Sequence, residues 1–289
     1  MRDEQQELND QTRKSADGSF IQLPNGITHY ELGGNESGKI VVLIHGFSVP
    51  YFIYDPTFKF LTATGFRVLR YDLFGRGFSD RPHVDYDLAL FVRQLADLLD
   101  AFRFTQPVNL IGLSMGGLVA AAFAVRHPER VNKVVLIDAA GAKPISLTPA
   151  LKAAKIPFVA EAVLSVVGSD ALIQNTARDF FDPVLVEHFI SKYRVQMQYK
   201  GFQRAILSSI RHGMLDGFIQ VYQSLGEMDR QILLFWGRKD ATVPFEHSQM
   251  LCEAMPGIQF HVIENCGHIP HYERPEIVNP ILLEFLNQP

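Results

Sequence analysis

Hydrophobic and polar residues follow two alternating patterns along most of the chain. Short continuous runs rich in Val, Ile and Leu are typical of strands buried on both faces of a parallel sheet. Between them, hydrophobic residues recur at the spacing of one helix face. The buried runs are residues 39–44, 67–71, 107–111, 131–137, 231–236 and 259–263, and the helical stretches are residues 55–64, 88–104, 115–126, 245–255 and 275–286. This alternation predicts an α/β fold with a mostly parallel sheet covered by helices on both faces.

The N-terminal part of the chain departs from this alternation. Residues 1–17 are polar throughout, and we expect them to form a solvated tail. Residues 19–34 contain two short strand patterns joined at Pro24, Asn25 and Gly26, which is typical of a hairpin. The two hairpin strands bring the predicted sheet to eight strands.

A second departure follows the sixth predicted strand. Residues 142–212 show helical patterns but no convincing central strand. An all-helical insertion at this point predicts a cap (lid) subdomain over the carboxyl edge of the sheet, where ligands bind in such folds. Residues 18–141 and 213–289 then form the core domain. Residues 156–167 are apolar, and packing of the cap against the sheet explains them best. The alternative is that they form a lid that makes transient contact with a lipid surface.

Composition and charge narrow the class of protein. The 289 residues are 47% hydrophobic, which is too apolar for a disordered chain. Lys and Arg number 27 against 31 Asp and Glu, so we expect no broad positive surface and no nucleic-acid partner. Glycines and Asn109 interrupt the apolar residues 108–125, and we expect no stable membrane insertion. A polar N-terminus and two cysteines without C-x-x-C spacing favour a cytoplasmic protein, either a monomer or a homodimer.

The strongest chemical signal is the sequence Gly-Leu-Ser-Met-Gly at residues 112–116, a G-x-S-x-G motif. It stands between a predicted strand and a predicted helix, which is the context that this motif requires. Glycine is expected on both sides because a sharp strand-to-helix turn strains the backbone and brings neighbouring chain close. The hydroxyl of Ser114 then lies at a helix N-terminus, which favours developing negative charge. We expect Ser114 to be a nucleophile, and an N-cap serine is the alternative.

Together with four other segments in the same order, this motif makes the chain resemble the α/β-hydrolase family, and within it the serine carboxylesterases and monoacylglycerol lipases. Residues 45–47 resemble the oxyanion loop of the family, and residues 72–79 resemble its D-x-x-G-x-G-x-S loop. Residues 237–240 resemble the segment that bears the catalytic acid, and residues 265–268 the segment that bears the catalytic histidine. The resemblance extends from about Ser19 to the end of the chain.

The resemblance implies a catalytic triad of Ser114, Asp240 and His268. A serine hydroxyl is a weak nucleophile, so His268 has to take its proton and later return it to the leaving alcohol. Asp240 would hold the imidazole in the useful tautomer and stabilise the imidazolium. The backbone N–H groups of Phe47 and Met115 would form the oxyanion hole.

Several other residues are candidates for supporting roles. Asp138 follows a predicted strand, where some family members keep the acid, and it is the alternative to Asp240. Asp72 is expected to stabilise its glycine-containing turn, and His45 to brace the oxyanion loop. No cluster has metal-ligand spacing and no G-x-G-x-x-G opens a helix, so we expect neither a metal nor another cofactor. Hydrophobic side chains expected in the substrate pocket are Phe47, Tyr51, Phe52 and Ile269.

The resemblance implies a serine hydrolase that cleaves small apolar esters with short- to medium-chain acyl groups through an acyl-enzyme on Ser114. Carbon–carbon bond hydrolases of the meta-cleavage type share the triad and the cap. They tend to have a glycine-rich oxyanion loop and a tryptophan after the catalytic histidine, where this chain has residues 47–50 (Phe-Ser-Val-Pro) and Ile269. Two other classes are compatible with this triad and fold: a perhydrolase, and a non-catalytic ligand receptor.

Overall fold

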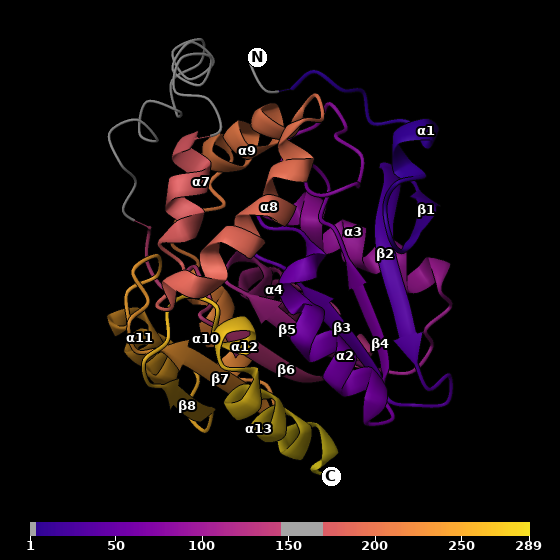
Figure 1. Cartoon of the computed structure of the whole chain (residues 1–289). Coiled ribbons are helices and arrows are strands. Elements are labelled where there is room, and N and C mark those ends of the chain that lie inside the picture. Colours follow the sequence, from indigo (N-terminus) through magenta and orange to yellow (C-terminus); the bar gives the residue numbers. More distant parts are fainter. Residues whose placement is uncertain (1–3, 146–169) are drawn as a thin grey trace.

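The computed structural model describes residues 4–145 and 170–289. In this part of the chain, eight strands form one sheet in the order β1-β2-β4-β3-β5-β6-β7-β8 (Figure 1). Strands β1, β2 and β4 pair antiparallel, and all pairs from β4 through β3 to β8 are parallel. The predicted mostly parallel, eight-stranded sheet is therefore confirmed.

The strands and helices have the following bounds. The strands are β1 (Ser19–Leu23), β2 (Gly26–Gly34), β3 (Ile40–Ile44), β4 (Arg67–Tyr71), β5 (Val108–Leu113), β6 (Val131–Ile137), β7 (Ile232–Gly237) and β8 (Gln259–Ile263). The α-helices are α1 (Asp10–Arg13), α2 (Asp55–Ala63), α3 (Leu88–Ala101), α4 (Met115–Arg126), α7 (Asp170–Ala177), α8 (Val186–Met197), α9 (Phe202–Arg211), α10 (Ile219–Gly226), α11 (Glu246–Ala254), α12 (Pro270–Glu273) and α13 (Pro275–Asn287). The 3-10 helices are η1 (Tyr51–Tyr54), η2 (Pro128–Arg130) and η3 (Pro183–Leu185). Every strand and helix predicted outside residues 142–212 is present, with ends shifted by a few residues.

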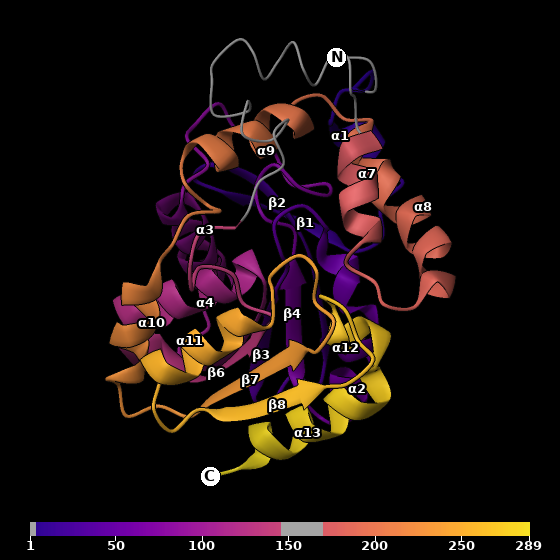
Figure 2. The same ribbon diagram turned by 90° about the vertical axis from the view of Figure 1, so that its left-hand side faces the viewer.

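Hydrophobic cores lie on both faces of the sheet because side chains alternate along each strand. Val42 and Ile44 of β3 belong to one core with residues of α3, α4 and α10. Val41 and Leu43 belong to the other core with residues of α2, α8, α9 and α13. Figure 2 shows α3, α4 and α10 on one side of the strands and α2 and α13 on the other. The continuous apolar runs in the sequence are therefore strands that are buried on both faces of the sheet.

The helices between β6 and β7 fall into two groups. Helix α10 packs against α4 and α11, so it belongs to the layer that covers the sheet. Helices α7, α8 and α9 lie together at one end of the sheet, away from α13 and the C-terminus (Figures 1 and 2). The division into core and cap stays a prediction, and residues 156–167, on which the lipid-contact alternative depends, lie outside the described residues. No helix among the described residues is both long and apolar enough to cross a membrane.

Most of the described part of the predicted N-terminal tail is exposed, but two of its side chains pack against the rest of the protein. Glu4 and Arg13 are buried. The Glu4 carboxylate accepts a hydrogen bond from the backbone N–H of Gln203 at the start of α9 (2.5 Å), and Arg13 pairs with Asp80 (2.5 Å). Polar side chains can be buried when each finds a partner, and those partners lie far away in the sequence.

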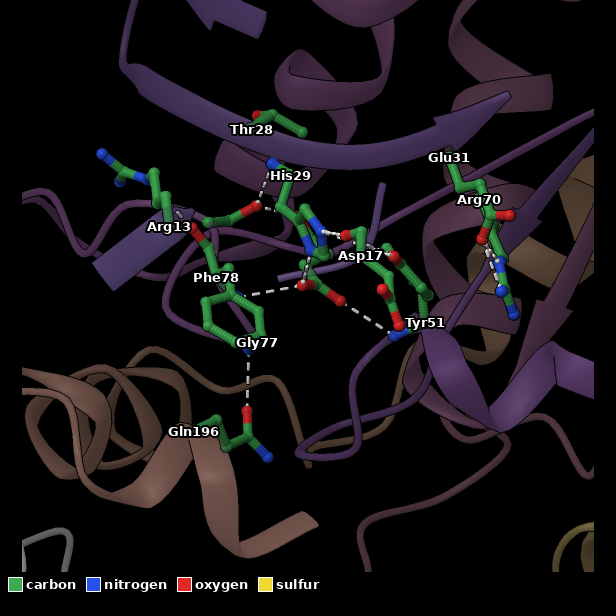
Figure 3. Close-up of polar contacts among 12 residues, drawn as sticks. Arg13, Asp17, Thr28, His29, Glu31, Tyr51, Arg70, Gly77, Phe78 and Gln196 are labelled. Atoms are coloured by element: carbon green, nitrogen blue, oxygen red, sulfur yellow. Dashed lines mark hydrogen bonds and ion pairs between the residues drawn. The ribbon is translucent and has the colours of Figure 1, made fainter. Parts of the chain in front are cut away.

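The loop after β4 is held by Asp72. Its Oδ1 accepts a hydrogen bond from the backbone N–H of Tyr51 (2.8 Å), and its Oδ2 accepts one from Phe78 (2.9 Å) and faces Nδ1 of His29 at 2.7 Å. A Cβ at Gly77, where φ is +50°, would lie 1.8 Å from Asp72 Oδ2, so glycine is required there. Figure 3 shows how His29, Tyr51 and Phe78 converge on this point. Asp72 therefore stabilises its turn, as the sequence indicates.

Candidate active site

Ser114 lies in the turn between β5 and α4. Its φ of +53° and ψ of −119° are rarely adopted by residues other than glycine. A Cβ at Gly112 would lie 2.3 Å from the carbonyl oxygen of Gly116, and a Cβ at Gly116 would lie 2.2 Å from that of Ile44. The tight contact between β5, α4 and β3 thus requires both glycines of the motif. It places Ser114 immediately before the first turn of α4.

His268 and Asp240 form a hydrogen-bonded pair beside this turn. Nδ1 of His268 lies 2.7 Å from Oδ2 of Asp240. Oδ1 of Asp240 accepts hydrogen bonds from the backbone N–H groups of Thr242 (2.8 Å) and Val243 (2.9 Å). A carboxylate oxygen can only accept, so Nδ1 carries the proton and Nε2 is left as the base. Burial opposes the charge on the imidazole, but the Asp240 carboxylate outweighs it and raises the pKa of His268 above its ordinary value.

The two N–H groups expected to bind an oxyanion belong to Met115 and Phe47. Met115 is the first residue of α4, so its N–H has no acceptor within the helix. Phe47 follows Gly46, at which a Cβ would lie 3.3 Å from Cβ of Ser114. Neither N–H has a hydrogen-bond acceptor among the described residues. Their role as an oxyanion hole stays a prediction, and their positions on either side of Ser114 are consistent with it.

The loop that carries Phe47 is braced by two buried side chains. Burial lowers the pKa of His45 to about 4, so its imidazole is neutral. Its Nδ1 donates to the carbonyl oxygen of Gly46 (2.8 Å), and its Nε2 accepts from the backbone N–H of Leu73 (2.9 Å). Nε of Arg76 donates to the carbonyl oxygen of Phe47 (2.8 Å). The loop therefore has a defined position relative to β4 and Ser114.

Asp138, the alternative acid, has a different environment from Asp240. Asp138, Asp240 and His268 each have one potential metal-ligand atom within 4.8 Å of the others. No other cluster that could hold a metal ion is found in the described ranges. Oδ1 of Asp138 accepts a hydrogen bond from the backbone N–H of Gly237 (2.9 Å). Burial and the charge of Asp240 raise the pKa of Asp138 well above its ordinary value. This shift favours the neutral form of Asp138, while Asp240 makes the hydrogen bond to His268.

A cavity of about 220 Å³ opens beside Ser114 and His268. Two of the four side chains predicted for the pocket, Phe47 and Ile269, line it. Its apolar wall is contributed by loops and by helices from distant parts of the chain. The apolar lining residues are Phe47, Val49, Ile53, Leu113, Ile145, Leu172, Ile210, Leu215, Ala241 and Ile269.

The pocket prediction was wrong for Tyr51 and Phe52. Both line a separate cavity of about 290 Å³. The ring of Tyr51 stacks with the guanidinium of Arg70 at 4.5 Å, and the ring centroid of Phe52 lies 5.0 Å from that of Phe189. The 3-10 helix that begins at Tyr51 turns successive side chains in different directions, and Ile53 is the one that reaches the active-site cavity.

Sequence reasoning missed the polar part of the cavity lining. Asn175 and Thr176 come from the last turn of α7, and Arg178 and Asp179 follow it. The backbone N–H of His268 donates to the carbonyl oxygen of Asp179 (2.7 Å), which brings this segment to the catalytic loop. No motif marks these residues, because their role depends on how α7 packs over the sheet.

Glu273 joins the His268 loop to the segment after α7. It is buried, and its Oε1 accepts hydrogen bonds from the backbone N–H groups of Phe181 (2.8 Å) and Asp182 (2.9 Å). Its Oε2 accepts one from the backbone N–H of Gly267 (2.7 Å), the residue before His268. One carboxylate thus satisfies three backbone donors from two distant segments.

Replacement of Glu273 by Gln is expected to lower the free energy of unfolding by about 2–4 kcal/mol, because the amide NH₂ would face a backbone donor in a buried site. The turnover number should fall as well, since the position of His268 loosens. Urea unfolding and steady-state kinetics measure the two effects. Glu276→Gln, an exposed substitution three residues later, is the matched control. An unchanged free energy of unfolding in Glu273→Gln would contradict this role for the carboxylate.

The chain belongs to the alpha/beta hydrolase family, which it matches over residues 41–281. A 2-hydroxy-6-oxo-2,4-heptadienoate hydrolase from Pseudomonas putida is 32% identical over 211 residues, 70% of this chain and 71% of that protein. A solved meta-cleavage product hydrolase from Pseudomonas fluorescens IP01 is 28% identical, covers 93% of this chain and 97% of its own, and superposes with a TM-score of 0.77. A solved membrane phospholipase A is 26% identical, covers 93% of this chain and 85% of its own, and has a TM-score of 0.73.

These findings establish the protein as an α/β hydrolase. The similar proteins reported above have different names: a dienoate hydrolase, a meta-cleavage product hydrolase and a phospholipase A. The bond that this chain cleaves therefore has to be argued from its own cavity.

Proposed function

We propose that the protein is a serine hydrolase that cleaves carboxylic esters with apolar, short- to medium-chain acyl groups. The observation that carries this proposal is the arrangement of Ser114 and His268 on one cavity, with His268 hydrogen-bonded to Asp240 at 2.7 Å. The apolar wall of the cavity suits an acyl chain. The triad and two backbone N–H groups are sufficient for this reaction, which needs no further catalytic group.

The mechanism follows from the roles that each group can perform. Oγ of Ser114 attacks the acyl carbonyl carbon while Nε2 of His268 takes its proton. The backbone N–H groups of Met115 and Phe47 stabilise the oxyanion. His268 then returns the proton to the leaving alcohol, and a water molecule, activated in the same way, releases the acid from Ser114.

Hydrolysis of a carbon–carbon bond is the second candidate. It is supported by the named activities of relatives at 28% and 32% identity that align along most of the chain. One feature favours the ester instead. Ile269 follows the catalytic histidine where relatives of the meta-cleavage type tend to have tryptophan.

Substrate comparison tests the proposal. The purified protein should hydrolyse p-nitrophenyl butyrate and hexanoate with a higher kcat/KM than 2-hydroxy-6-oxo-2,4-heptadienoate. Hydrolysis of the dienoate is measured by the loss of its absorbance. The medium-length chains should be hydrolysed faster than palmitate, because a cavity of about 220 Å³ suits a short acyl chain better than a long one. A dienoate preference of tenfold or more would overturn the ester proposal in favour of the second candidate.

A further inference from the structure

The active-site cavity has a polar wall next to its catalytic histidine. The last turn of α7 and the residues after it supply most of this wall, and Thr242 from the loop that carries Asp240 supplies another part. The polar lining residues besides Ser114 and His268 are Ser48, Asn175, Thr176, Arg178, Asp179 and Thr242. An apolar ester with no other functional group would leave this wall without a partner.

Asp179 is held next to His268 by contacts of its own backbone. Its carbonyl oxygen accepts a hydrogen bond from the N–H of His268 at 2.7 Å. A Cβ at Gly267 would lie only 2.2 Å from the same oxygen, so the two segments touch directly. Glu273 holds the backbone after Asp179 through the N–H groups of Phe181 and Asp182. The position of Asp179 relative to the histidine is therefore set by backbone atoms and does not depend on its side chain.

Among the described residues, the carboxyl group of Asp179 accepts a hydrogen bond from one side chain only. Oδ1 accepts a hydrogen bond from the hydroxyl of Thr242 at 2.5 Å. No donor to Oδ2 is found in residues 4–145 and 170–289. The side chain is only partly buried, and both Asp179 and Thr242 line the cavity. A ligand in the cavity can therefore supply the missing donor.

Asp179 is ionised at physiological pH, although its surroundings raise its pKa. Burial and the charges of Asp240 and Glu273 raise the pKa, His268 and the hydrogen bond from Thr242 lower it, and the result is a pKa of about 6. Arg178 also lines the cavity and is exposed. Above pH 6 the group is a carboxylate, which accepts hydrogen bonds and attracts cations but repels anions.

His268 gives its proton to the leaving alcohol, so a group beside His268 faces the alcohol part of the substrate rather than the acyl part. We propose that Asp179 is a specificity-determining residue whose carboxyl group accepts a hydrogen bond from a hydroxyl or ammonium group on the alcohol part of the ester. This inference rests on the proposed ester hydrolysis. It assigns the substrate class as esters of an apolar acid with a polyhydric or amino alcohol.

Three butyrate esters test this assignment. Propyl butyrate has no donor on its alcohol, 1-monobutyrin has two hydroxyl groups on the same three-carbon chain, and 3-(dimethylamino)propyl butyrate has one N–H donor when protonated. We expect the kcat/KM of one of the two donor-bearing esters to exceed that of propyl butyrate by about tenfold. This factor is the usual contribution of one hydrogen bond to a charged group. Which of the two is preferred distinguishes a hydroxyl from an ammonium group.

Substitution and pH separate recognition by Asp179 from other causes of the preference. In Asp179→Asn, and in Asp179→Ser as a second variant, the ratio of kcat/KM values between the preferred ester and propyl butyrate should fall about tenfold. In the unsubstituted protein the same ratio should fall below pH 6, and in Asp179→Asn it should not change with pH. The titration of His268 affects both esters equally and cancels in the ratio. Asp229→Asn, at an exposed position, is the matched control and should keep the original ratio.

The outcomes for the two proposals are distinct. A ratio that is unchanged in both Asp179 variants, or equal rates for all three esters in the unsubstituted protein, would overturn the role of Asp179 while ester hydrolysis stands. Failure of the unsubstituted protein to hydrolyse propyl and p-nitrophenyl butyrate would overturn the proposed function, and this assignment with it.

Discussion

Ser114→Ala should lower kcat/KM for p-nitrophenyl butyrate by about 10⁴- to 10⁶-fold, as expected for the loss of the nucleophile from a serine triad. The reason is that no other group in the cavity can form the acyl intermediate in this geometry. The remaining slow hydrolysis would come from binding and from the N–H groups of Met115 and Phe47. Initial rates at saturating and limiting ester concentration measure the effect.

The alanine variant should fold like the original protein. The backbone of Ser114 has a positive φ that alanine tolerates no worse than serine, and its N–H and carbonyl oxygen keep their hydrogen bonds with Ile137, Gly117 and Ala140. Thermal unfolding followed by circular dichroism checks this. Ser191→Ala, an exposed substitution on α8, is the matched control and should leave both stability and rate unchanged. Activity above one tenth of the original in Ser114→Ala would exclude Ser114 as the nucleophile.

Asp240→Asn is expected to lower kcat by about 10³- to 10⁴-fold, because an amide at this position favours the wrong tautomer of His268 and removes the charge that stabilises the imidazolium. It should also move the acid limb of the pH–rate profile. The Asp240 carboxylate raises the pKa of His268. Without that charge the pKa of His268 falls, so the remaining activity should persist to lower pH than in the unsubstituted protein. A pH–rate profile of kcat/KM measures both effects.

Asp138→Asn is the matched control for this prediction. Burial and the charge of Asp240 raise the pKa of Asp138 well above its ordinary value, which favours the neutral form of its carboxyl group. An amide therefore replaces a neutral group, and the acid limb should stay in place. Its effect on kcat should be no more than about tenfold, far smaller than that of Asp240→Asn. If Asp138→Asn lowers kcat more than Asp240→Asn does, the acid of the triad is Asp138 and not Asp240.

That Ser114, Asp240 and His268 belong to one site could be predicted because each residue lies in a short motif that follows a strand. The glycines at positions 112 and 116 are needed by contacts within a single turn and with the neighbouring strand, so the sequence retains a visible signal. Alternation of apolar runs predicted the sheet for a similar reason. A strand buried on both faces has to be apolar throughout, whatever it packs against.

Other features could not be predicted because the residues that determine them are distant in the chain. Residues 1–17 look solvated by composition, yet Glu4 and Arg13 are buried by partners near residue 203 and at Asp80. Tyr51 and Phe52 look like pocket residues by their position, and a 3-10 helix turns them into another cavity. In each case the deciding contact is made by a segment whose position no local pattern reveals.

The sequence by itself determined the order of strands and helices, the class of fold and the residues expected to carry out the chemistry, since these depend on interactions over a few neighbouring residues. Only the tertiary structure decided which side chains line the cavity. It brought Asp179 and the end of α7 to His268, joined them through Glu273, and gave Asp240 rather than Asp138 the hydrogen bond to His268. Those contacts form between segments that are far apart in the chain, and their energies exist only once the chain has packed.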